Sequence, residues 1–210
     1  MQPVFLSYFY EESTPVYGGK TDTISFIPNS SISKGDTANS VTINLPNHSG
    51  THLDFPRHFS DDGKTCSDYP PAFWIFEKVG FLACNIEEVP TKIAELQTDI
   101  ELLILKTGFG SKRNEEVYWS SQPVIPASFG PLLRAAFPQL RVFGFDLISL
   151  TSKLDRAEGK KAHLTFLIEN DILVLEDMNL QDLTISPSKV IICPILIKDA
   201  DGTPCTVIAF

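Results

Sequence analysis

Six short runs rich in β-branched and aromatic residues constrain the fold of this 210-residue chain more than any other feature. They predict strands at 79–86, 101–107, 141–147, 172–176, 189–197 and 203–210. Several of the runs are apolar at consecutive positions, which is typical of strands covered on both faces. We therefore expect a large sheet with other elements packed against it.

Helical patterns are few. The best of them cover 90–97 and 127–137, the second bounded by Pro126 and Pro138, and a third covers 162–168. Strands interspersed with few helices indicate a mixed α/β or α+β architecture. Because no repeat, low-complexity tract or polar linker divides the chain, we expect one domain over residues 1–210.

Asp146 falls near the end of the predicted strand 141–147. Functional groups often lie at strand ends in α/β proteins, although an aspartate there could equally cap a turn. The sequence leaves both interpretations open.

The charge balance argues against a nucleic-acid partner. The net charge is −9, and basic residues gather in no run longer than a pair such as Lys160-Lys161, whereas phosphate binding needs concentrated positive charge. No run of about 18 apolar residues suggests a membrane span, and the N-terminal stretch lacks the pattern of a signal peptide. We expect a cytosolic protein that binds a small molecule.

The four cysteines support the same compartment. They are far apart and form no C-x-x-C pair, which is the usage of a reducing environment. We expect buried thiols at Cys66, Cys84, Cys193 and Cys205.

The segment NHSGTHLDFPRH, residues 47–58, holds three of the four histidines. Gly50 and Pro56 disfavour a helix here, and in an extended segment His52 and Asp54 share one face. Their positions lie about 6.6 Å apart, so both can reach one ion. His48 would lie about 13 Å from His52 in a straight strand, so the chain must bend, and Gly50 permits the bend.

Three histidines could also gather by chance, because a histidine in a surface loop is usually only a hydrogen-bonding group. Their concentration with an aspartate in eleven residues favours metal or catalytic use. The zincin motif H-E-x-x-H is absent, so a different kind of metal site is expected.

The segment resembles the signature H-x-G-T-H-x-D-x-P-x-H of the cyclase family of metal-dependent hydrolases, whose members include bacterial kynurenine formamidases and isatin hydrolases. Four further stretches resemble family elements in the same order along nearly the whole chain. They are TPVYG at 14–18, LKTG at 105–108, GFDLIS at 144–149, and AH at 162–163 with ILVLEDMNL at 172–180.

The resemblance implies metal ligands at His48, His52 and Asp54, with His163 and Glu176 completing the site. It further implies that the two carboxylates bridge when two ions bind. Without the resemblance, His163 would read as a solvated histidine at a helix start. Glu176 is harder to dismiss, because an unpaired carboxylate after a buried strand is costly.

The resemblance also implies roles around the metal. His58 would transfer protons, and Tyr17 stands where related formamidases carry a tryptophan that stacks on substrate. Phe59 belongs to the aromatic residues around the motif and is a second candidate for substrate binding. Asp177 is the alternative ligand if the match at Glu176 is displaced by one residue. The implied fold is a swivelling β/β/α domain that assembles as a homodimer or larger oligomer.

Imidazole and carboxylate ligands suit divalent zinc, manganese or iron. Such an ion lowers the pKa of bound water and polarises a carbonyl oxygen. We expect a hydrolase that uses one or two zinc or manganese ions to cleave the C–N bond of a small amide, formamide or lactam, aromatic or apolar in character. A metal-dependent cyclase or dehydratase and a non-catalytic metal-binding protein remain the alternatives.

Overall fold

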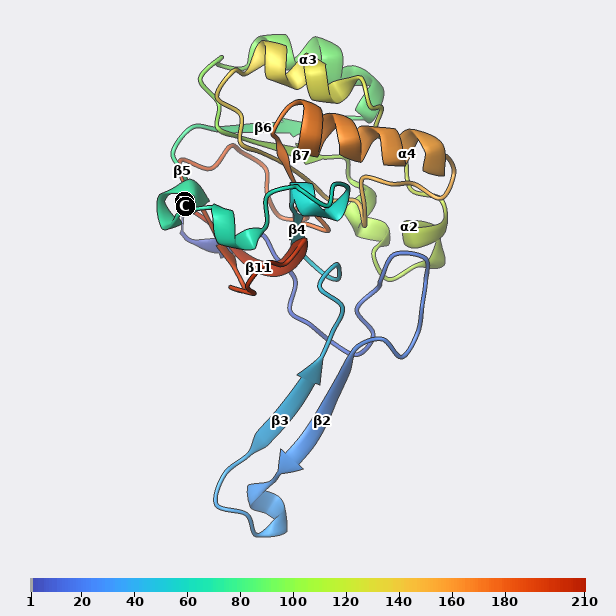
Figure 1. Ribbon diagram of the computed structural model, residues 1–210, viewed down its shortest axis with the longest axis vertical. Coiled ribbons are helices and arrows are strands. Elements are labelled where there is room, and N and C mark those ends of the chain that lie inside the picture. Colours follow the sequence, from blue (N-terminus) through green and yellow to red (C-terminus); the bar gives the residue numbers. More distant parts are fainter. Residues whose placement is uncertain (1) are drawn as a thin grey trace.

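A mixed sheet of nine strands forms the centre of the computed structural model, which describes residues 2–210 (Figure 1). Its spatial order is β5-β10-β11-β4-β9-β8-β7-β6, and β1 pairs with β11. The strands are β1 (Val4–Phe5), β4 (His52–Asp54), β5 (Ile75–Phe76), β6 (Val79–Ala83), β7 (Leu102–Lys106), β8 (Val142–Phe145), β9 (Leu173–Glu176), β10 (Val190–Pro194) and β11 (Gly202–Ala209). The expected mixed α/β architecture with a large sheet and few helices is confirmed.

The strands β6, β7, β8 and β9 run parallel, and helical segments connect them. The connections contain α1 (Val89–Lys92), α2 (Glu116–Ser120), α3 (Phe129–Ala136), α4 (Arg156–His163) and a π-helical continuation of α4 (Leu164–Glu169). In Figure 1, α3 and α4 lie together on one side of β6 and β7. Every residue of β8 and β9 is buried, as expected for strands covered on both faces.

The sheet curls until its far end approaches the start of β8. Arg141, just before β8, donates hydrogen bonds of 2.8 and 2.9 Å to the carbonyl oxygens of Phe73 and Ile75. Its guanidinium lies 4.4 Å from the ring centroid of Phe76 in β5. The sheet is therefore nearly closed.

The short strand β4 lies between β9 and β11, antiparallel to both. His52 pairs with Glu176, and Asp54 pairs with Gly202. Three segments that are far apart in the chain thus meet at β4.

A second, two-stranded sheet is formed by β2 (Ser25–Ser30) and β3 (Ser40–Asn44). This hairpin arm, residues 25–44, projects from the rest of the molecule (Figure 1). Four large apolar side chains on it are 47 to 59% exposed, namely Ile27, Ile32, Val41 and Ile43. The hairpin was not predicted from the sequence.

All six predicted strands are present; five are shorter than predicted, whereas β11 has the predicted length and begins one residue earlier. The strand expected at 79–86 ends at Ala83, because a 3-10 turn begins at Ile86 with Asn85 in a capping box. The helix predicted at 127–137 is α3, whereas 90–97 holds one α-helical turn followed by a 3-10 turn.

The third predicted helix begins earlier than its pattern indicates. Asp155 caps α4, accepting a 2.9 Å hydrogen bond from the Glu158 amide, so the helix starts before residue 162. Charged residues and Gly159 hide the pattern in its first turns.

Asp146 anchors a turn. Its carboxylate accepts backbone hydrogen bonds of 2.8 Å from Thr107 and 2.9 Å from Gly108, which supports the second interpretation of this residue.

The prediction for the cysteines was wrong in part. Cys66 and Cys205 are buried, but Cys84 is half-buried and Cys193 is exposed on β10. Within residues 2–210, no helix combines the length and apolar character that crossing a membrane requires.

Phe143→Ala should lower the free energy of unfolding by about 3–5 kcal/mol, because it leaves a cavity in the core. Phe143 is fully buried on β8, and its ring stacks 5.3 Å from that of Phe166 in the helical layer. Urea denaturation measures the loss. The same truncation at Phe9, which is 81% exposed, is the control and should change stability by less than about 0.5 kcal/mol. Equal effects at both positions would contradict this account of the core.

Candidate metal centre

The bend expected before β4 is present. Gly50 has a φ of +57°, in the left-handed region that favours glycine. The chain turns back there, so the rings of His48 and His52 lie 5.3 Å apart between centroids. His48 Nδ1 lies 2.8 Å from Asp54 Oδ1.

His52 is held by the bend itself. Its Nδ1 lies 2.8 Å from the Gly50 carbonyl oxygen, which can only accept, so this nitrogen carries the proton. Nε2 is therefore the nitrogen with a free electron pair. It lies 3.5 Å from Asp54 Oδ1 and 3.4 Å from Glu176 Oε2.

His163, the last residue of α4, meets the same carboxylates from the other side. Its Nδ1 donates a 2.9 Å hydrogen bond to the Gly159 carbonyl oxygen. Its Nε2 lies 3.3 Å from Asp54 Oδ2 and 3.6 Å from Glu176 Oε1. Asp54 and Glu176 thus each direct one oxygen to His52 and the other to His163.

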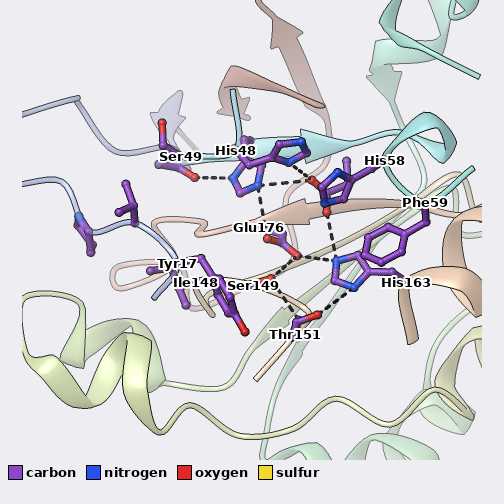
Figure 2. Close-up of a pocket in the computed structure, with 15 residues that line it drawn as sticks. Tyr17, His48, Ser49, His58, Phe59, Ile148, Ser149, Thr151, His163 and Glu176 are labelled. Carbon is purple, nitrogen blue, oxygen red and sulfur yellow. Dashed lines mark hydrogen bonds and ion pairs between the residues drawn. The ribbon is translucent and has the colours of Figure 1, made fainter. Parts of the chain in front are cut away.

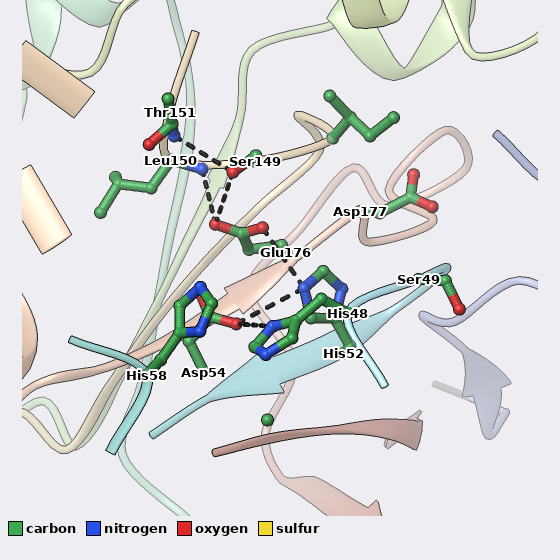
Figure 3. A network of polar contacts seen from close by, with 12 residues as sticks. His48, Ser49, His52, Asp54, His58, Ser149, Leu150, Thr151, Glu176 and Asp177 are labelled. Carbon is green, nitrogen blue, oxygen red and sulfur yellow. Dashed lines mark hydrogen bonds and ion pairs between the residues drawn. The ribbon is translucent and has the colours of Figure 1, made fainter. Parts of the chain in front are cut away.

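These spacings fit a divalent ion. Two ligands about 2.1 Å from a tetrahedral ion lie roughly 3.4 Å apart, which matches the distances from Nε2 of His52 to its two carboxylate oxygens. One ring nitrogen of His52 and one carboxylate oxygen each of Asp54 and Glu176 lie within 4.8 Å of one another. Figure 3 shows these side chains converging.

Burial and neighbouring charges shift the pKa of Asp54 in opposite directions. Desolvation alone would raise the pKa of Asp54, but hydrogen bonds from His163 and His48 and the charges of His52 and His48 hold it well below its usual range. The carboxylate therefore stays ionised although the side chain is only 1% exposed.

The histidines show the complementary effect. Burial alone would lower the pKa of His48, yet Asp54 and Asp201 raise it to about 9. Burial alone would also lower the pKa of His163, but Asp54 and Glu176 raise it to about 10. Without a metal, protons on these rings neutralise the buried carboxylates.

Glu176 is oriented by the loop that follows β8. Its Oε1 accepts a 2.6 Å hydrogen bond from the Leu150 amide and one of 3.3 Å from the Ser149 hydroxyl. Ser149 lies in the GFDLIS stretch, for which the sequence predicted no specific contact.

Asp201 is a site residue that sequence reasoning missed. Its Oδ2 lies 3.0 Å from His48 Nε2 and 3.0 Å from His58 Nδ1. The next residue, Gly202, lies so close to His48 that a Cβ atom added to it would be 2.2 Å from Cε1 of the His48 ring. Before folding, an Asp-Gly pair indicates only a turn, and Asp201 lies 153 residues from His48 in the chain.

His58 is the last residue of a 3-10 turn, Pro56–His58, which follows shortly after β4. Its ring stacks on that of His48, with centroids 4.0 Å apart, and lies 6.0 Å from that of His163. His48, Asp54 and His58 also offer atoms within 4.8 Å of one another. The geometry alone is compatible with either a ligand or a proton-transfer role for His58.

A pocket of about 300 Å³ opens onto this cluster, and both predicted substrate-binding residues line it (Figure 2). The Phe59 ring stacks on that of His163 with centroids 4.5 Å apart. The Tyr17 hydroxyl is buried and has no hydrogen-bond partner in the described chain. Three other aromatic residues in or after the motif belong to the core, namely Phe55, Trp74 and Phe76.

Asp177, the alternative ligand, turns away from the cluster (Figure 3). Its carboxylate accepts 2.7 and 2.9 Å hydrogen bonds from Arg113 and one of 2.6 Å from the Tyr118 hydroxyl. Glu176 therefore faces the pocket and Asp177 does not.

Comparison with known proteins agrees with this geometry. A family model described as a putative cyclase matches residues 4–151. Kynurenine formamidase from Bacillus anthracis is 30% identical over 159 residues, which are 75% of this chain and 73% of that protein. The chain thus shares sequence with a named enzyme over most of both lengths.

Solved structures share the fold over almost the whole chain. An isatin hydrolase bound to the product analogue thioisatinate superposes with a TM-score of 0.80 at 17% identity, covering 99% of this chain and 91% of that one. Isatin hydrolase A from Labrenzia aggregata reaches 0.82 at 18% identity, covering 99% and 93%. By the family model and the sequence relatives together, the chain belongs to the cyclase family.

Proposed function

We propose that this chain is a metal-dependent hydrolase that cleaves the C–N bond of a small amide, formamide or lactam. The proposal rests on one observation: the buried carboxylates of Asp54 and Glu176 each direct one oxygen to His52 and the other to His163. These groups lie beside a pocket that reaches the surface. Kynurenine formamidase among the relatives supports a formamide or similar amide as substrate.

The metal would be held by His48, His52, Asp54, His163 and Glu176. Bound there, zinc or manganese supplies Lewis acidity, which lowers the pKa of water and polarises a carbonyl oxygen. Two ions fit the arrangement best, because each carboxylate has one oxygen near His52 and one near His163.

The remaining residues handle protons and substrate. Asp201 holds Nδ1 of His58, and in residues 2–210 no hydrogen bond engages Nε2 of that ring. Such a nitrogen can take a proton from water and pass it to the leaving nitrogen. Phe59 and Tyr17 give the pocket aromatic walls, which suits an aryl or apolar substrate.

We further propose a cytosolic homodimer formed through the hairpin arm. An isolated two-stranded hairpin is marginally stable in water, and this one exposes four large apolar side chains. Packing against a second copy of the chain would bury them.

Asp54→Asn should abolish metal binding, because it removes one of the two carboxylate oxygens that lie next to His52 and His163. His58→Gln should keep the metal and lower kcat by about 10²–10⁴-fold, the usual contribution of a general acid-base group. Elemental analysis and formate release from formanilide measure the two effects. Asp62→Asn, on the exposed loop after the motif, is the matched control and should change neither.

Normal turnover in His58→Gln would remove His58 from proton transfer. Loss of metal in the same variant would make it a ligand instead.

Metal uptake near pH 7.5 should release protons, because the metal-free rings of His48 and His163 have pKa values raised to about 9 and about 10. Ligand histidines must be neutral, so the apparent affinity should increase as the pH rises from 7 towards 9. A pH-indicator dye in weak buffer, during addition of zinc to chelator-treated protein, measures the release. Uptake without proton release would show that these rings are neutral before the metal binds.

Ile27→Glu/Ile43→Glu should shift the protein from dimer to monomer, since it replaces two of the exposed apolar side chains of the arm, one on each face, with charged ones. Light scattering after size exclusion measures the mass. Lys34→Glu, on the same arm, is the control for a change of charge alone. A native monomer, or a dimer that withstands the double substitution, would exclude the arm as the interface.

A further inference from the structure

A second hollow, which we call the basic vestibule, adjoins the metal pocket. It has a volume of about 450 Å³ and shares three lining residues with the metal pocket, namely Tyr17, Phe59 and Thr151. A ligand of moderate length can therefore occupy both spaces across this common wall.

The vestibule is positively charged in a protein that is negative overall. Its other side chains include four cationic ones and no carboxylate, whereas the chain carries a net charge of −9. The four are Lys20, Lys153, Arg156 and Lys160. Local charge of the opposite sign to the whole molecule attracts a ligand that the rest of the surface repels.

These four cations are free of ion pairs throughout residues 2–210. Two carboxylates at the N-terminal end of α4 already accept hydrogen bonds from backbone amides, Asp155 from Glu158 and the Glu158 side chain from Ala127 at 2.7 Å. Lys153 is held in place by a 3.0 Å hydrogen bond to the Gly18 carbonyl oxygen. The positive charge is therefore left for a ligand.

A polar group on the wall shared by the two spaces also indicates that a ligand binds there. Tyr17 lines both spaces, and its buried hydroxyl lacks a hydrogen-bond partner in the described chain. A buried hydroxyl without a partner costs free energy, which an oxygen atom of a ligand passing this wall would recover.

We infer that the substrate carries a carboxylate that binds in the basic vestibule while its amide group reaches the metal centre. The inference rests on the proposed hydrolase function and makes it narrower. The substrate class is then an anionic aryl amide or formamide. Lys153, Arg156 and Lys160 determine the specificity for substrates that carry a carboxylate over uncharged ones.

Matched substrate pairs test the inference. The probes are formanilides with a para chain of one to three methylene groups, ending either in a carboxylate or in the isosteric carboxamide. With metal-loaded protein in about 20 mM salt, formate release should show at least one acid with a kcat/KM about tenfold above its carboxamide. The ratio should fall several-fold in about 300 mM salt, because charges are screened.

Arg156→Gln/Lys160→Gln should reduce the ratio of acid to carboxamide kcat/KM about tenfold. Both side chains are exposed, so the fold should tolerate the change. Lys78→Gln/Lys198→Gln removes the same charge from other exposed positions and should leave the ratio unchanged. Equal kcat/KM for every acid and its carboxamide, or equal loss in both double variants, would overturn the inference.

A binding measurement separates this inference from the hydrolase proposal. If no formanilide is cleaved, calorimetry compares the ketone acid 4-acetylphenylacetate with its amide, neither of which contains an anilide bond. Acid-selective binding that is lost in Arg156→Gln/Lys160→Gln would support the vestibule and refute only the hydrolase proposal. Equal binding of the acid and its amide would overturn the vestibule.

Discussion

Two carboxylates buried side by side are the constraint on which the rest of this structure depends. Asp54 and Glu176 are 1% and 2% exposed, and ionised groups at such positions are costly unless positive charge lies close to them. Pairing of β4 with β9 and β11 places His52 between the two acids, and α4 delivers His163 from the opposite side. The rings of His48 and His163, which neutralise the acids as protonated imidazoles, can bind a divalent ion as neutral ones.

Backbone geometry holds this cluster together. Gly50, with its positive φ, turns His48 back towards Asp54, and Gly202 leaves room for the His48 ring. Behind the cluster, the Thr51 hydroxyl donates a 2.6 Å hydrogen bond to the carbonyl oxygen of Asp177. Asp177 itself has a φ of +50° and is secured by Arg113, so the turn after β9 and the start of β4 are joined. Hydrogen bonds outside the ligand set thereby orient the ligands.

Charge is distributed unevenly around the centre. The chain as a whole is negative, whereas the space beyond Tyr17 and Phe59 is lined by cations. A field of this form draws the charged end of an anionic ligand towards these cations. Aromatic rings on the shared wall separate the two regions and offer an apolar surface to the middle of such a ligand.

The sequence by itself determined the local features: six strands, the bent histidine segment, and a candidate metal site containing His52 and Asp54. These follow from periodicity, glycine conformation and side-chain parity, which act over a few residues. For His163 and Glu176 it offered only the family resemblance, and Asp201 went unnoticed. Only the tertiary structure decided those contacts, the outward turn of Asp177, and the hairpin arm. The physical reason is that strand pairing joins residues more than 120 positions apart, and no local pattern records which strands will pair.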